Sequence, residues 1–250
     1  MSIRVAKICK SGHSPTTDGY ENIIIKMKSH SRWWKLSPFY LKDSYGRIME
    51  NLYQGSKCYS HLTAQQIPYS RWDPTIIWQY PEDDHVVNNI LQPSYWLWRE
   101  KLMSNAYAVR YPNGYNGRKD CLCSVYIKPS DPKCTDLLPL PHSKVVPDAI
   151  ECLDYIASRK KIYCQVYLNL VKREPLYSQL QEKVNRGEKL QICDVDGPVY
   201  DNYYPNNEVI NDSININQDN IKCFLNDPKY PFGHGFVLAI ALIGKEEWLL

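Results

Sequence analysis

Residues 189–195 read Lys-Leu-Gln-Ile-Cys-Asp-Val and are followed at once by Asp-Gly-Pro at 196–198. Apolar and polar side chains alternate along the first of these segments, which is the pattern of a β-strand, whereas Asp-Gly-Pro is typical of a turn. A second apolar run, at 21–28, contains three consecutive isoleucines, and such β-branched residues favour strands over helices. Both segments therefore predict strands, and 21–28 is expected to be a central strand of its sheet.

Helical patterns occupy much of the remaining chain. Helices are expected at 48–59, at 95–107 with Ser94 as N-cap, from Pro147 along the apolar stripe Ile150, Leu153 and Ile156, at 160–172, at 174–186 up to Gly187, and at 236–244. A short strand is expected at 75–79 and a long Asn-rich surface loop at 202–220.

These elements together predict an α+β or α/β fold. We expect one compact mixed domain over residues 1–250, in which helices flank a central sheet and long loops are inserted between the elements. The segment 129–147 contains five prolines and little periodicity, so it is a possible hinge or insertion.

Composition argues against several classes of protein. The chain has 250 residues, of which 44% are hydrophobic, and contains no run of about eighteen apolar residues that could span a membrane. The first ten residues lack a signal-peptide core, and nine scattered cysteines, an odd number, favour reduced thiols. We therefore expect a cytoplasmic protein without a membrane partner. The net charge of +3 is too small to indicate a nucleic-acid partner by itself.

One motif in the N-terminal part of the chain indicates a function. It reads Leu-Ser-Pro-Phe-Tyr at 36–40, then Gly46, then Glu-Asn-Leu-Tyr-Gln-Gly-Ser-Lys at 50–57. In order and spacing it resembles the N-terminal signature of the NADAR family, which runs Leu-Ser-x-Phe-Tyr, a turn with Gly, then Glu-His-x-Phe/Tyr-Gln-Ala-x-Lys. Asn51 stands where the family usually has His.

Looser similarities follow later in the chain. The helix containing Trp98, the acidic residues Asp194 and Asp196, and the Gly-His-Gly sequence at 233–235 resemble later segments of the same family. The whole chain also resembles uncharacterised proteins of large DNA viruses, which would place it in the cytoplasm of a host cell or in a virion.

The resemblance implies cleavage of an N-glycosidic bond in a small nucleotide-derived substrate, ADP-ribose-linked or from the riboflavin pathway, or in an ADP-ribosylated target, without cofactor or metal. Such a bond breaks through an oxocarbenium-like state, which a carboxylate can stabilise or whose attacking water it can activate. Glu50 is expected in the first turn of a helix, with Lys57 near the same helical face two turns later. The predicted catalytic residues are Glu50 and Lys57, and the predicted substrate-binding residues are Tyr53, Gln54, Trp98, Asp194, Asp196 and His234.

Other interpretations stay open for the same residues. On an ordinary amphipathic helix, Glu50, Gln54 and Lys57 would form a solvated face. The chain would then be a non-catalytic viral structural or interaction protein that retains the fold. A third possibility is a nucleic-acid-associated protein that binds through basic residues of 110–119.

Two further patterns carry weaker signals. His85 follows three acidic residues at 82–84, which is compatible with a metal or acid–base cluster but is more typical of a solvated loop. Cys121-x-Cys123 with Cys134 lacks the paired spacing of a structural zinc site, so core or surface thiols are favoured there.

Overall fold

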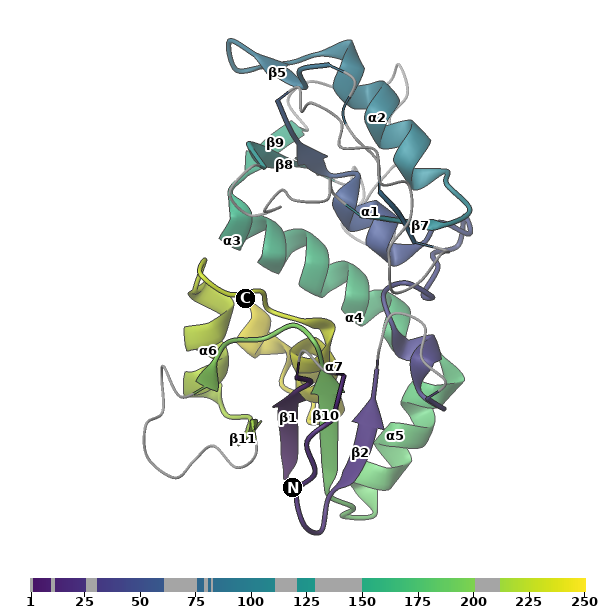
Figure 1. The fold of residues 1–250 in the computed structure, drawn as a ribbon, viewed down its shortest axis with the longest axis vertical. Helices are drawn as coiled ribbons and strands as arrows, with labels where there is room; N and C mark the ends of the chain where they lie inside the picture. The colour runs from purple at the N-terminus through teal and green to yellow at the C-terminus, as the bar shows by residue number, and fades with distance from the viewer. Residues whose placement is uncertain are drawn as a thin grey trace. The chain divides into compact units, whose positions relative to one another are not determined.

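The protein is described by a computed structural model over residues 2–9, 12–25, 31–60, 76–78, 81, 83–110, 121–128, 150–200 and 212–250. The fold mixes helices with small sheets, as predicted. The chain forms two compact units: a first unit of Met1–Leu41 and Tyr167–Leu250, and a second unit of Lys42–Val166 (Figure 1). The proposed hinge at 129–147 lies outside the described residues, and the single domain over 1–250 stays a prediction.

The first unit contains a four-stranded sheet in the order β11-β1-β10-β2. The strands β1 (Ile3–Lys7), β10 (Leu190–Asp194) and β2 (Glu21–Ile24) are parallel, and β11 (Ser213–Asn215) runs antiparallel to β1. Both predicted strands are thereby confirmed. The expected central position belongs to β10 and not to β2, because β10 pairs on both sides and is buried along its whole length.

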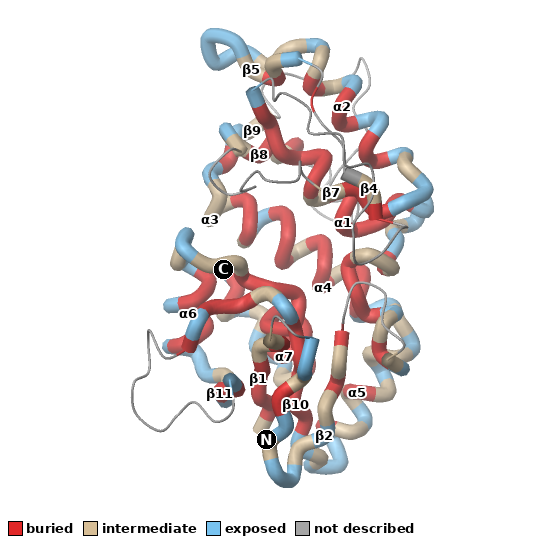
Figure 2. The backbone as a smooth tube through the Cα atoms, viewed as in Figure 1, coloured by how far each residue is buried: buried red, intermediate tan, exposed pale blue. Residues whose placement is uncertain are grey.

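A buried helix packs on this sheet. Every residue of α7 (His234–Leu242) is buried, and the helix lies against β1 and β10 (Figure 2). Its small and apolar side chains suit a position with no solvent-facing side, as the sequence predicts. The predicted helix at 174–186 is α5 (Pro175–Asn185), which ends before Gly187.

The Asn-rich segment is only partly described, and its second half is not a loop. Residues 201–211 lie outside the described part of the chain. The strand β11 and the helix α6 (Gln218–Asn226) come after these residues. Asn217 and Asn220 exchange side-chain and backbone hydrogen bonds in a capping box that begins α6. The prediction of a loop up to 220 is therefore wrong, because these asparagines start a helix.

The second unit is built from short elements. Its strands form a three-stranded antiparallel sheet of β3 (Lys57–Cys58), β8 (Cys123–Ile127) and β9 (Ile150–Leu153), a parallel pair of β4 (Ile76–Trp78) and β7 (Ala108–Arg110), and a hairpin of β5 (Val86–Val87) and β6 (Ile90–Leu91). Its helices are α1 (Met49–Gln54), α2 (Pro93–Met103) and α3 (Tyr155–Ser158), the last followed by the π-helical segment η3 (Arg159–Cys164). The helix α4 (Gln165–Val171) begins in this unit and continues into the first unit. The strand predicted at 75–79 is confirmed as β4.

Three expectations for this unit are wrong. The helix predicted from Pro147 through Ile156 is wrong at 150–153, which form the strand β9 paired with β8. Ile156 lies in the short helix α3, and residues 147–149 are outside the described part of the chain. The helix predicted at 48–59 ends at Gln54. Ser94 is not the N-cap of α2, since Gln92 takes that position and the Ser94 hydroxyl donates to the Asp84 carbonyl (2.5 Å).

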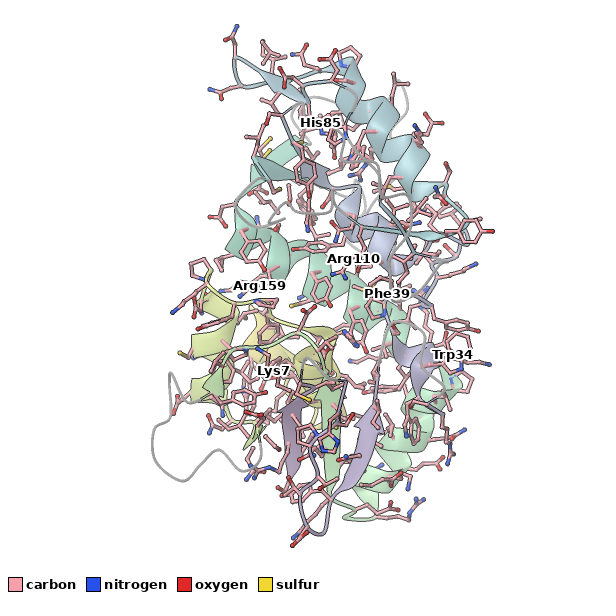
Figure 3. The ribbon with its side chains drawn as sticks, viewed as in Figure 1. Lys7, Trp34, Phe39, His85, Arg110 and Arg159 are labelled. Atoms are coloured by element: carbon pink, nitrogen blue, oxygen red, sulfur yellow. The ribbon has the colours of Figure 1, made fainter. Side chains whose placement is uncertain are left out.

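The core of the second unit surrounds a buried histidine. His85 Nδ1 accepts a hydrogen bond from the Tyr59 backbone N–H (3.1 Å), and its ring lies against Tyr95 and Trp98, with centroids 5.6 and 5.4 Å away (Figure 3). Burial lowers the pKa of His85 to about 4, although the nearby Asp84 and Asp83 oppose the shift. His85 is thus a neutral structural residue that receives a backbone donor.

No helix within the described ranges combines the length and apolarity needed to cross a membrane.

We expect Gly187→Ala to lower the free energy of unfolding by about 1 kcal/mol, because Gly187 has φ +81° with open space around it, so backbone strain is the only cost. Gly187→Asn is the matched control, since asparagine tolerates the left-handed conformation and should cost less. Urea unfolding of the two variants measures the difference. Equal stabilities of both variants and the parent would contradict the assignment.

The free energy of unfolding should fall as the pH drops from about 6.5 to about 4. In this range the histidine of the unfolded chain binds a proton, whereas buried His85 of the folded protein stays neutral. The loss is up to about 3 kcal/mol. His85→Phe should flatten this slope even though it lowers stability overall, whereas His13→Gln, at an exposed position, should leave the slope unchanged. Denaturant unfolding at several pH values gives the slopes, and an unaltered slope in His85→Phe would rule out His85 as its source.

Candidate functional site

Three polar side chains of the second unit form a continuous buried row, which we call the polar row: Glu50, Gln54 and Lys57. Gln54 Nε2 donates to Glu50 Oε1 (2.8 Å), and Lys57 Nζ donates to Gln54 Oε1 (3.0 Å). The three residues are only 6%, 5% and 4% exposed. A solvated helix face is therefore ruled out for them.

The polar row is built by the end of α1. Glu50 and Gln54 are one turn apart, which places their side chains on the same face of the helix. A Cβ at Gly55 would lie 2.9 Å from the Asn51 carbonyl oxygen, so the backbone of α1 leaves no room for a side chain there, and the flexible Met103 side chain of α2 lies 3.1 Å from the same position. The chain leaves the helix at this glycine, and Lys57 returns to Gln54 from β3. The expectation that Lys57 lies two turns along the same helix is therefore wrong, although the amine still reaches the row.

Asn51 anchors α1 through three hydrogen bonds to backbone groups. Its side-chain Nδ2 donates to the carbonyls of Asn105 (3.2 Å) and Tyr107 (2.9 Å), and its Oδ1 accepts from the Val109 N–H (2.7 Å). All polar atoms of this fully buried side chain are engaged with the backbone before and within β7. Asn51 consequently has a structural role that fixes α1, and the row with it.

The ring of Tyr53 lies against the amine end of the polar row. Lys57 Nζ lies 4.4 Å from the centroid of the Tyr53 ring, and the Tyr53 ring packs against Tyr163 at 5.0 Å. Burial, together with the nearby Tyr155, raises the pKa of Tyr53 well above its usual range, although a hydrogen bond with Ser158 opposes the shift. Tyr53 is thus a neutral phenol whose ring face attracts the ammonium group.

The segment 155–164 adds residues that the motif does not indicate. Arg159, labelled in Figure 3, is buried and lies over the Tyr155 ring at 4.6 Å. Both residues act on the pKa of Tyr53, which Tyr155 raises and Arg159 lowers. Tyr155, Arg159 and Tyr163 recur every four residues, the spacing of one helix face, so the sequence contains a signal that could have found them.

Trp98 lies in a different part of the second unit. It packs in an apolar cluster with Cys58, Tyr59 and Tyr95. Because Cys58 and Lys57 are consecutive on β3, their side chains point to opposite faces of the sheet. The structure thus groups Trp98 with the core and not with the polar row, and its contact with a substrate stays a prediction.

Asp194, Asp196 and His234 belong to the first unit. Asp194, the last residue of β10, accepts hydrogen bonds from the backbone N–H groups of Gly235 (2.8 Å) and Asp196 (3.3 Å), and its Oδ2 lies 3.3 Å from His234 Nδ1. A Cβ at Gly233 would lie 2.3 Å from Asp194 Oδ2, so glycine is required beside the carboxylate.

Burial raises the pKa of Asp194, although His234 opposes the shift. The Asp194 carboxylate accepts a backbone hydrogen bond at the N-terminus of α7 and so fixes the Gly-His-Gly sequence there. The structure thus brings Asp194 and His234 together, with Asp196 joined through its backbone, and substrate contacts by these residues stay predictions.

Among the described residues, no group of three histidine, cysteine or acidic side chains is arranged to hold a metal ion. Cys134, Glu82, Arg118 and Lys119 lie outside the described ranges, so the weaker metal and nucleic-acid patterns that include them are described only in part.

Comparison with known proteins gave no significant match to any family model, curated protein or solved structure. The NADAR resemblance therefore stays a prediction from the motif residues.

Proposed function

We propose that the chain hydrolyses an N-glycosidic bond in a nucleotide-derived substrate, ADP-ribose-linked or from the riboflavin pathway, with Glu50 as the catalytic carboxylate. The observation that supports the proposal is the burial of the polar row. Charged helix positions are almost always solvated unless they are paired, and burial of a carboxylate and an amine together is costly. Such an arrangement is more typical of functional sites than of ordinary surface helices.

The chemistry requires a negative charge next to the anomeric carbon as the bond breaks. Glu50 supplies that charge from a sheltered position, where an electrostatic interaction is stronger than in water. It would either stabilise the oxocarbenium-like state directly or accept a proton from the attacking water.

Gln54 acts in this proposal as a positioning residue. Its amide nitrogen is engaged with Glu50 and its amide oxygen with Lys57, so it holds the acid and the amine at a fixed separation. Both ends of the amide are used within the polar row, and the predicted contact of Gln54 with a substrate stays a prediction.

Lys57 and Tyr53 act as a pair. The ammonium group of Lys57 lies over the face of the Tyr53 ring, and this cation–π contact fixes the direction of the lysine side chain. The amine would then bind an anionic or electron-rich group of the substrate, such as a phosphate oxygen or the departing base.

Glu50→Gln should reduce turnover of ADP-ribose derivatives or riboflavin-pathway intermediates by at least about 100-fold, because it removes the charge and keeps the shape. Glu100→Gln, at an exposed carboxylate of α2, is the matched control and should keep full activity. Release of free base or ribose product is followed by chromatography, with thermal unfolding to check that both variants fold. Full activity of Glu50→Gln on a substrate that the parent cleaves would refute the role of this carboxylate.

Gln54→Leu should lower kcat by about 100-fold with little change in KM, because a displaced carboxylate affects the reaction more than binding. Steady-state kinetics measure kcat and KM of the variant and of the parent protein. A variant that loses stability but keeps kcat would show that Gln54 is only structural.

A further inference from the structure

Three cysteines of the second unit project from one face of the β3–β8–β9 sheet. Cys58 of β3 is directly opposite Cys123 of β8, and Cys152 of β9 is opposite Val125, two residues beyond Cys123. Side chains alternate between the two faces along a strand, and paired residues share a face. Cys58, Cys123 and Cys152 are therefore neighbours on the same side, in a row across three strands.

Strand geometry favours one pair among the three. Directly opposite residues of antiparallel strands have Cα atoms about 4.5–5.5 Å apart, which lies within the range of about 4.4–6.8 Å found in disulfides. The diagonal pair Cys123 and Cys152 has an expected separation of about 7–8 Å, beyond that range. Cys58 and Cys123 can thus be joined without moving the strands.

The two thiols of this pair differ in environment. Cys58 is fully buried, and burial raises its pKa, whereas Cys123 is half-buried. A hydrogen bond from the Cys58 thiol lowers the pKa of Cys123 to about 7, with a smaller contribution from Cys152 and against the effect of burial. Cys123 is consequently the thiol that carries substantial thiolate at neutral pH, and thiolates are the species that react with peroxides.

We propose that Cys123 is a site of reversible oxidation by a hydroperoxide and that it closes a disulfide with Cys58. The Cys123 thiolate attacks one oxygen of hydrogen peroxide, the O–O bond breaks, and the departing hydroxide takes a proton to leave as water, which gives a sulfenic acid. The Cys58 sulfur then attacks the Cys123 sulfur, the S–S bond forms, and the hydroxyl leaves with the Cys58 proton as a second water. The two thiols lose two electrons in total, and the peroxide is reduced to two waters.

The disulfide would join β3 to β8. Lys57 immediately precedes Cys58 on β3, so the crosslink would restrict the strand that carries the amine of the polar row. Only this consequence for the site rests on the proposed function, whereas the crosslink itself does not.

The test uses the reduced full-length protein and hydrogen peroxide, with residual thiols alkylated before and after denaturation and peptides mapped by mass spectrometry. The expected product is a Cys58–Cys123 peptide that disappears after treatment with dithiothreitol. Cys123 should be consumed at least about tenfold faster than Cys152, whose pKa is raised to about 11 by burial, because the Cys123 thiolate is the more populated. The oxidised protein should also unfold at a higher temperature than the reduced protein.

Two variants separate this pair from its neighbours. Cys123→Ser should abolish the crosslink, while Cys152→Ser should leave it in place. Because the wild-type peptide map needs no variant, a folding defect in either one does not affect the main result. Oxidation that joins Cys123 to Cys152, or that leaves Cys58 alkylatable after denaturation while Cys223 reacts, would overturn the proposal. Failure of glycosidase assays would not affect it.

Discussion

The second unit depends on keeping a carboxylate and an amine away from water. A charge that loses its hydration costs several kcal/mol unless its hydrogen-bonding capacity is met inside the protein. Gln54 meets part of that need at both ends, since one amide donates to Glu50 and accepts from Lys57. The glycine after the helix, the buried Asn51 and the Tyr53 ring beside Lys57 all help to hold these three groups in place.

The first unit also buries a carboxylate, that of Asp194, but stabilises it with different partners. Asp194 is fully buried at the end of the central strand, and its partners are two backbone N–H groups and an imidazole. Glycines must flank His234 because the carboxylate occupies the space that a side chain would take. A turn sequence after the strand and a helix start far along the chain are thus parts of one local structure.

Local patterns predicted much of this fold. The strand at 190–194 and the helices α5 and α7 depend on short-range apolar patterns and on nearby Gly, which the sequence displays directly. Patterns that depend on distant partners were not predictable in this way. Ile150–Leu153 is a strand because β8 is available to pair with it, and β2 is an edge strand because β10 lies between it and β1.

The residues of the candidate site also fall into two groups, those whose proximity follows from local sequence and those that depend on distant contacts. Glu50, Tyr53 and Gln54 share one short helix, so their proximity follows from the motif alone, whereas Lys57 required knowledge that Met103 packs against Gly55. Tyr155, Arg159 and Tyr163 show helical spacing, but nothing local indicates that their face meets Tyr53. Trp98 belongs to the core because the face of β3 that carries Cys58 is turned toward α2.

The π-helical segment between Arg159 and Cys164 affects which deletions the sequence can tolerate during evolution. A π-helical turn contains one residue more than the α-helical turn it replaces. Because the π-helical turn absorbs that extra residue, loss of a single residue there would restore regular winding and leave the side chains just after it in nearly the same direction as before. The segment can therefore lose one residue at a small cost to the helix that continues from it, whereas the same deletion in the regular helix α5 would turn every following side chain by about 100°.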